Sequence, residues 1–291
     1  MLYNYFNFPK TKGVFAVKKV LCAAVFILLT ASVVFGAAIS STSVGFLTRL
    51  NTSETEFARI IQDSTSTTGW HLLSKRHELY GVKFFDSLMT MQMALGRGEI
   101  DEIALPEVVA EYLLKANPDF EACCSVRTRS PMALAFGFRK DNAVLASKFN
   151  SALRKMEEDY SLAELEGIYI YNNGITRPVK FDHFDGADTV KVAVTGDMPP
   201  IDYVDEAGNP AGFNTALLAE LGRHMQVNIE LVQVEAGARA SALASEQADV
   251  VFWFETVPGV MWNYDAADGV LLSDPYFSWN KFLHIRKKDQ Q

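Results

Sequence analysis

The sequence predicts an α/β protein of two similar lobes, and two observations support this prediction. An Ala-Leu pair is followed six residues later by an Asp and then by an apolar run, and this pattern occurs twice, at 94–105 and at 242–254. Segments with strand and helix patterns also alternate along both halves of the chain. Such alternation gives parallel sheets with helices on both faces. Two lobes on one plan indicate a clamshell that closes on a ligand.

In the first half, the alternating pattern begins at Ser43. Val44 and Phe46 predict a strand over 43–48, and Asn51-Thr52-Ser53 supplies N-cap residues for the helix that follows. The other elements predicted here are a strand at 82–85, a helix from Asp86 or Ser87, a strand at 100–105 and a helix that Pro106 opens.

The second half repeats this pattern from Val190. A long loop is expected from Gly196 to Gly212, with Asn214 as the N-cap of the next helix. The other predicted elements are strands at 190–195, 228–234 and 249–254, a helix at 237–244, helices within 143–170 and a polar linker at 171–189. Ligands of such sheets bind at the carboxyl ends of the strands.

Composition and charge limit the possible functions. The 291 residues are 49% hydrophobic, which is enough to bury a sizeable core in one or two domains. The net charge is −8. The first 38 residues contain four lysines and no Asp or Glu, so the rest of the chain is more acidic than this value indicates. An acidic body is a poor electrostatic match for nucleic acid, so no nucleic-acid partner is expected.

The first 38 residues have the parts of a secretory signal. Four lysines precede an apolar run from Val20 to Phe35, and the small residues Gly36-Ala37-Ala38 follow it. We therefore expect export to the periplasm or to the outer face of the cytoplasmic membrane, with membrane contact only through this segment. An uncleaved membrane anchor is the alternative.

The body contains two adjacent cysteines, Cys123 and Cys124. Neighbouring cysteines rarely bridge each other, so two half-buried thiols are expected. The sequence has no zinc-type cysteine pairing, Gly-rich phosphate loop or nucleophile elbow. We therefore predict no enzyme activity, no cofactor and no metal.

From Val190 onward the sequence resembles family 3 of the extracellular solute-binding proteins, the type that binds polar amino acids for ABC importers. The residues that carry the resemblance are Pro199-Pro200, Gly212-Phe213-Asn214, Ala248-Asp249-Val250 and Ser273-Asp274-Pro275-Tyr276, in that order. The resemblance implies the type II periplasmic-binding-protein fold, in which two Rossmann-like lobes are joined by a hinge.

Residues 43–170 resemble the remainder of the same family, so the lobe order is swapped. The matching residues are Val44 to Thr48, Gly98 to Asp101, Ala110-Glu111-Tyr112 and Phe136 to Lys140. A circular permutation accounts for this order, and a fragment of two tandem domains is the alternative. Permutation implies one unbroken crossing near 132–136, a second crossing split between the N-terminal side of Ser43 and the strand at 282–285, and a looser hinge. The implied domains are a signal or anchor at 1–38, lobe 2 at 43–133, helices packing on lobe 1 at 134–170, the linker at 171–189 and lobe 1 at 190–286.

The family binds an amino-acid carboxylate with an Arg and a helix N-terminus, and the ammonium group with an acidic residue. The helix N-terminus matches Asn51, Thr52 and Ser53, for which ordinary N-capping is the alternative role. The family Arg is missing between the strand at 249–254 and Ser273, and its acidic anchor is replaced by Pro106 beside Glu107. Replacement ligand-binding residues are Arg49, Asp197, Met198, Trp253, Phe254 and Glu255; solvent exposure of Arg49 and a core position of Trp253 remain alternatives.

These observations predict a monomeric, exported protein that captures a small polar solute, an amino acid or a related compound, and presents it to an ABC transporter permease. A membrane-tethered sensor or interaction module without solute transport is the alternative, and the missing anchors favour it. An enzyme on this fold is a third reading, since the fold does not fix the function.

Overall fold

The computed structural model describes residues 44–47, 82–85, 87–171, 179–235, 238–256 and 270–288. Contacts divide the chain into two units, Met1–Ser41 and Thr42–Gln291, and every described residue lies in the second unit. The predicted signal segment and the caps at 51–53 therefore lie outside the described residues. Within the described part, no helix is long and apolar enough to cross a membrane.

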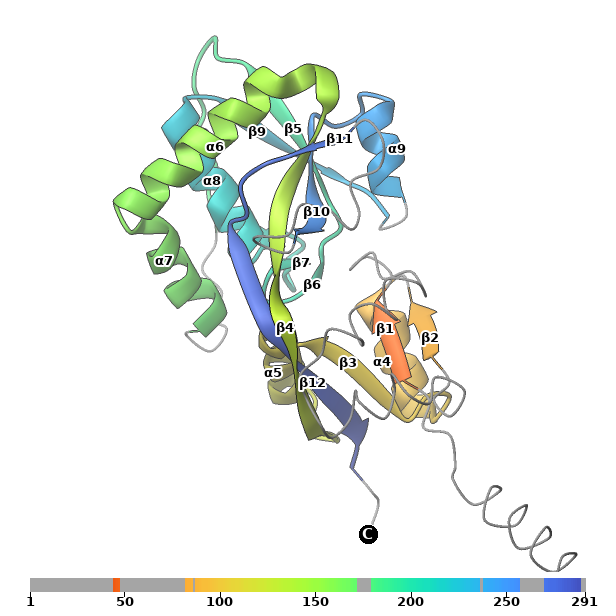
Figure 1. Cartoon of the computed structure of the whole chain (residues 1–291). Coiled ribbons are helices and arrows are strands. Elements are labelled where there is room, and N and C mark those ends of the chain that lie inside the picture. The colour runs from red at the N-terminus through yellow and green to blue at the C-terminus, as the bar shows by residue number, and fades with distance from the viewer. Residues whose placement is uncertain are drawn as a thin grey trace, which may run out of the picture. The chain divides into compact units, whose positions relative to one another are not determined.

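A mixed sheet of nine described strands forms the centre of the second unit (Figure 1), and its path runs in the order β2-β1-β3-β12-β4-β10-β5-β9, with β11 paired to β4. Strands β1, β2 and β3 pair in parallel, as do β5, β9 and β10. The predicted α/β class is therefore confirmed. The strands are β1 (Val44–Leu47), β2 (Val82–Phe85), β3 (Glu102–Pro106), β4 (Phe120–Arg139), β5 (Thr189–Val194), β9 (Asn228–Gln233), β10 (Val250–Thr256), β11 (Val270–Leu272) and β12 (Phe277–Lys287).

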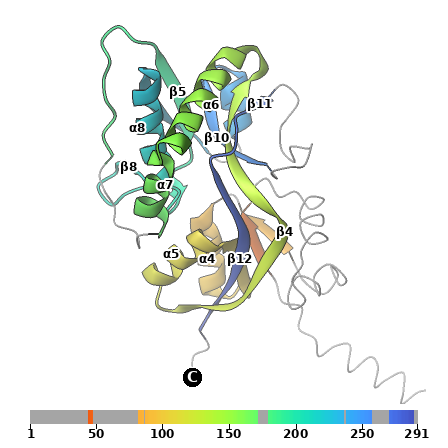
Figure 2. The same ribbon diagram turned by 60° about the vertical axis from the view of Figure 1, so that its left-hand side comes forward.

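Two long antiparallel strands, β4 and β12, link the two parallel groups. Figure 1 and Figure 2 both show them side by side, and their pairing runs from Phe277 opposite Leu134 to Lys287 opposite Phe120. The far end of β12 also pairs with β3, so this one strand reaches both groups. The prediction that one crossing is split was therefore wrong, because β12 is continuous. The expectation of a looser hinge loses its basis.

The helices follow the predicted positions closely. Helix α4 (Leu88–Arg97) begins after Ser87, whose side chain accepts a hydrogen bond from the Thr90 amide at 3.2 Å. Helix α5 (Glu107–Ala116) begins directly after Pro106. The others are α6 (Ala143–Glu158), α7 (Ser161–Glu166), α8 (Phe213–Met225), α9 (Arg239–Ala244), a 3₁₀ turn at Lys140–Asn142 and a π-helical turn at Gly167–Tyr171.

The segment from Gly196 to Gly212, predicted as a loop, contains a small antiparallel sheet. Its strands are β6 (Asp197–Met198), β7 (Asp202–Val204) and β8 (Pro210–Ala211). The turn after β7 is held by Asp205, whose Oδ1 accepts from the amides of Ala207 at 2.9 Å and Asn209 at 2.8 Å. The segment is therefore an ordered unit.

The N-cap of α8 is Gly212, so the prediction of Asn214 was wrong. The cap residue has φ 100°, a conformation that disfavours side chains other than glycine. Asn214 lies inside the helix, and its Oδ1 accepts from the buried Tyr276 hydroxyl at 3.3 Å. The Asn of the Gly-Phe-Asn motif thus ties α8 to the Ser-Asp-Pro-Tyr motif.

An aromatic cluster forms the centre of the core. The Phe136 ring on β4 lies 5.0 Å from Phe149 of α6, 5.3 Å from Phe252 of β10 and 4.7 Å from Tyr276. Phe136 and Phe149 are fully buried. These contacts join residues before the polar segment at 179–188 to residues after it, so both parts of the chain share one core.

We expect Gly212→Ala to destabilise the protein by about 3 kcal/mol. A Cβ at this position would lie 2.7 Å from the carbonyl oxygens of Ile201 and Pro200. Gly208→Ala is the matched control, because Gly208 has φ 83° but open space around it. The control is expected to cost about 1 kcal/mol. Urea unfolding of both variants checks this, and equal losses would contradict it.

Candidate functional site

The candidate site is a cavity of about 680 Å³ between elements of the two parallel groups. From the β1–β3 side, it is lined by Leu88, Met89 and Gln92 of α4 and by Tyr112 of α5. From the β5 side, the lining residues come from the small sheet and its flanks: Gly196, Asp197, Pro199, Tyr203, Val204, Asp205, Glu206 and Ala207. The volume is in the range of small-molecule sites.

Two tyrosines meet across this cavity. The rings of Tyr112 on α5 and Tyr203 on β7 have centroids 6.0 Å apart and planes at 48°. Burial, together with the smaller effects of the neighbouring Tyr112 and Asp205, raises the pKa of Tyr203 to about 12. Tyr203 therefore stays a neutral hydroxyl at physiological pH, with an aromatic face and a hydrogen-bonding tip.

A buried carboxylate holds the small sheet against β5. Asp202 is 6% exposed, and its Oδ2 accepts from the Thr195 amide, the Thr195 hydroxyl and the Gly196 amide, each at 3.2 Å. Three donors on one carboxylate compensate for its burial. Asp202 thereby fixes the strand that carries Tyr203 and the turn that carries Gly196.

The described lining of the cavity is acidic. It contains the carboxylates of Asp197, Asp205 and Glu206, and none of its described residues is a lysine or an arginine. Hydrogen bonds from the Asn209, Ala207 and Gly208 backbone amides lower the pKa of Asp205, the bond from Asn209 most strongly. Asp205 is therefore ionised at neutral pH.

Among the described residues, Asp197 is the predicted binding residue that the structure places in the cavity lining. Asp197 lines the cavity, whereas its neighbour Met198 is buried at 8% exposure and lies outside the lining. Glu107 also lies outside the lining, where its carboxylate pairs with Lys281 of β12. A role of Met198 or Glu107 in binding therefore stays a prediction.

The other predicted residues cannot be placed in the cavity. Arg49, Asn51, Thr52 and Ser53 lie outside the described residues. Trp253, Phe254 and Glu255 lie on β10, whose pairing with β4 shifts register between Phe252 and Phe254. Their roles stay predictions. Tyr112 and Gln92 were not among the predicted binding residues, although the tyrosine belongs to the Ala110-Glu111-Tyr112 match.

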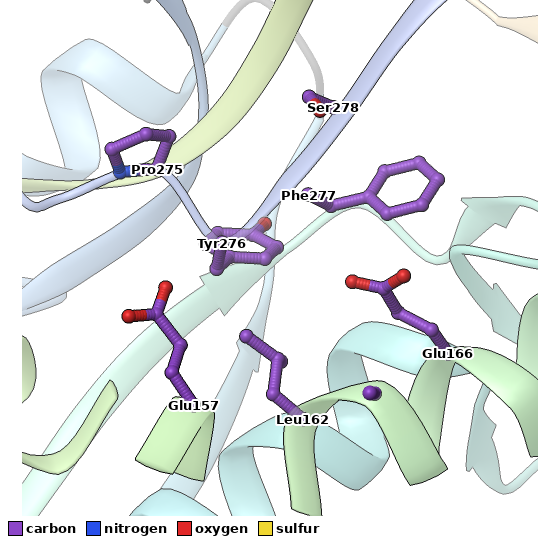
Figure 3. Close-up of a pocket in the computed structure, with 8 residues that line it drawn as sticks. Glu157, Leu162, Glu166, Pro275, Tyr276, Phe277 and Ser278 are labelled. Carbon is purple, nitrogen blue, oxygen red and sulfur yellow. The ribbon is translucent and has the colours of Figure 1, made fainter. Parts of the chain in front are cut away.

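A second, smaller cavity of about 360 Å³ lies between α6, α7 and the start of β12. Figure 3 shows the carboxylates of Glu157 and Glu166 on either side of Leu162, facing Tyr276. Burial raises the pKa of Glu166. All of its lining residues come from 157–166 and 275–278, so this cavity does not join the two parallel groups.

Residues 190–291 match the family model of bacterial extracellular solute-binding proteins, family 3. This match confirms the resemblance to family 3 predicted from Val190 onward, and it covers about a third of the chain. The matched family consists of binding proteins, in agreement with the prediction of a non-enzymatic role. No curated protein matches the sequence.

Some solved structures are similar to this chain at low sequence identity. The ligand-binding component of an ABC-type import system from Staphylococcus aureus, with zinc bound, is 9% identical with a TM-score of 0.42, over 84% of this chain and 65% of that one. The methionine-binding protein MetQ is 15% identical with a TM-score of 0.40, over 86% and 84%. Full-length CbnR bound to its target DNA is 13% identical with a TM-score of 0.40, over 97% and 76%.

We expect Asp202→Ala to lower the free energy of unfolding by about 2 kcal/mol, because its backbone donors lose a buried acceptor. Asp188→Ala, at an exposed position before β5, is the control and should change stability by less than about 0.5 kcal/mol. Chemical unfolding of both variants measures the difference. A loss no larger than that of the control would show that Asp202 does not anchor the small sheet.

Proposed function

We propose that this chain is an extracytoplasmic solute-binding protein that captures a small polar solute, an amino acid or a related compound, for an ABC importer. The family match over residues 190–291 supports solute binding. The observation that carries the proposal is the cavity whose lining comes from α4 and α5 on one side and from β6 and β7 on the other.

This arrangement fits a closure mechanism. A solute that contacts both sides of the cavity binds the closed form better than the open form, and only this difference shifts the balance between them. The paired strands β4 and β12 connect the two groups of elements and are the natural hinge. A permease then recognises the closed form.

The charges of the described lining favour a solute with a positive group. Asp197, Asp205 and Glu206 supply carboxylates, and the rings of Tyr112 and Tyr203 supply faces that attract cations. A primary amine or the ammonium group of an amino acid meets both requirements. An anionic solute without an amine would face only repulsion from these residues.

The remaining parts of the proposal rest on the sequence. The N-terminal segment directs export to the periplasm or the outer membrane face, and the protein acts as a monomer. The order of the two lobes arose by circular permutation, and the aromatic core shared by residues 136, 149, 252 and 276 supports one complete fold rather than two partial domains.

The test is thermal unfolding of the full-length chain, in mild detergent, against amino acids, polyamines and small carboxylates. A solute at 100 times its Kd adds about 2.7 kcal/mol to the stability. We expect amine-bearing solutes to raise Tm and carboxylates without an amine to leave it unchanged. No shift for any solute, in a protein that unfolds cooperatively, would favour the membrane-tethered sensor or interaction module.

A variant pair then locates the site. Asp197→Asn removes one negative charge from the cavity and is expected to weaken the binding of an amine solute by about tenfold. Asp188→Asn makes the same change outside the cavity lining and is expected to leave the affinity unchanged. Isothermal titration measures both. Equal affinities for the two variants would place the solute elsewhere.

A further inference from the structure

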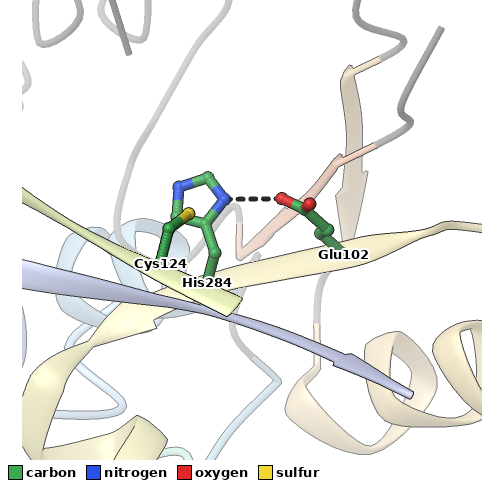
Figure 4. Close-up of side chains that lie close together, drawn as sticks. All are labelled: Glu102, Cys124 and His284. Atoms are coloured by element: carbon green, nitrogen blue, oxygen red, sulfur yellow. Dashed lines mark hydrogen bonds and ion pairs between the residues drawn. The ribbon is translucent and has the colours of Figure 1, made fainter. Parts of the chain in front are cut away.

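Three side chains from three adjacent strands converge outside the solute cavity. Glu102 of β3, Cys124 of β4 and His284 of β12 each offer one ligand atom, and these atoms all lie within 4.8 Å of one another (Figure 4). His284 pairs with Cys124 on one neighbouring strand and with Ala104, two residues after Glu102, on the other. The alternation of side chains along strands puts all three on one face of the sheet.

A β-bulge places a second thiol beside this cluster. His284 pairs with Cys124, but Ile285 pairs with Ala122, so Cys123 is the extra residue on β4. The two sulfur atoms lie 3.9 Å apart, and both cysteines are free thiols. This confirms the prediction of two half-buried thiols and adds that the bulge brings the sulfurs together.

Close contacts already join the members of this cluster and the adjacent thiol. His284 Nδ1 lies 2.8 Å from Glu102 Oε2, and Cys123 Sγ lies 3.9 Å from Cys124 Sγ. His284 is 2% exposed, so water has little access to this donor set.

We propose that Glu102, Cys124 and His284 bind a divalent transition metal that prefers thiolate and imidazole ligands, with Zn²⁺ as the best match. Tetrahedral ligands at about 2.0–2.3 Å from zinc stand about 3.3–3.8 Å apart. Donors within 4.8 Å therefore need to move by only about 1 Å to reach this geometry. A carboxylate, a thiolate and an imidazole are all zinc ligands, and a water or the neighbouring Cys123 can take the fourth position.

The metal would act as a clamp between strands. Its ligands come from residues 102, 124 and 284, which are far apart in sequence but lie on β3, β4 and β12. A metal that binds only the folded protein stabilises it by mass action. The clamp would hold the C-terminal part of β12 in the sheet, where this strand pairs with β3. None of the three ligands lines the solute cavity.

The experiment titrates Zn²⁺ into the reduced full-length chain and follows Tm, and it repeats the titration with Co²⁺ to record thiolate-to-metal charge-transfer absorption. We expect saturable one-to-one binding, a rise in Tm, and the charge-transfer band. Cys124→Ser should remove the band and weaken Zn²⁺ binding by about 100-fold. Glu102→Gln should weaken binding as well, and this replacement nearly preserves the side chain's size.

Cys123→Ser is the matched control, because it removes the adjacent thiol but leaves all three proposed ligands. It should keep the Co²⁺ band and the one-to-one stoichiometry. Absence of saturable binding by the reduced wild-type chain would overturn the proposal. Retention of the Co²⁺ charge-transfer band in Cys124→Ser would also overturn it. Loss of folding in Cys124→Ser is checked by its Tm without metal, and Glu102→Gln then decides.

Discussion

The antiparallel pairing of β4 with β12 is the interaction on which the rest of the structure depends. These strands lie far apart in the sequence, yet they pair from Phe277 opposite Leu134 to Lys287 opposite Phe120. At one end, β4 pairs with β10 in the β5 group, and at the other, β12 pairs with β3. Because ladder hydrogen bonds extend through both regions, the two parallel groups become parts of one sheet.

The core repeats this connection in side chains. Phe136 of β4 contacts Phe149, Phe252 and Tyr276, which come from α6, β10 and the segment before β12. Tyr276 in turn donates its hydroxyl to Asn214 of α8. The ring of Phe213 also lies 6.2 Å from that of Tyr276, so a hydrogen bond and an aromatic contact together join the Gly-Phe-Asn and Ser-Asp-Pro-Tyr motifs.

The cavity depends on a smaller constraint, the anchoring of the segment at 196–212. Asp202 accepts three hydrogen bonds from Thr195 and Gly196, and Gly212 permits the close approach to Pro200 and Ile201. Together these contacts fix Asp197 and Tyr203 on one wall of the cavity. The cluster of Glu102, Cys124 and His284 depends instead on the pairing of β4 with β12, because the bulge at Cys123 determines which side chains face His284.

The sequence by itself determined the α/β class and the positions of most helices and strands, because hydrophobic periodicity and capping residues are local properties of each segment. Its motifs also determined the relation of residues 190–291 to family 3. It also singled out Asp197 of the cavity. Only the tertiary structure decided that β12 is continuous, that Gly212 rather than Asn214 caps α8, and that Tyr112 faces Tyr203. The same holds for the meeting of Glu102, Cys124 and His284. Each of these features depends on strand register, on close approach of the backbone or on contacts between residues far apart in the chain. Local sequence patterns do not predict such long-range relations.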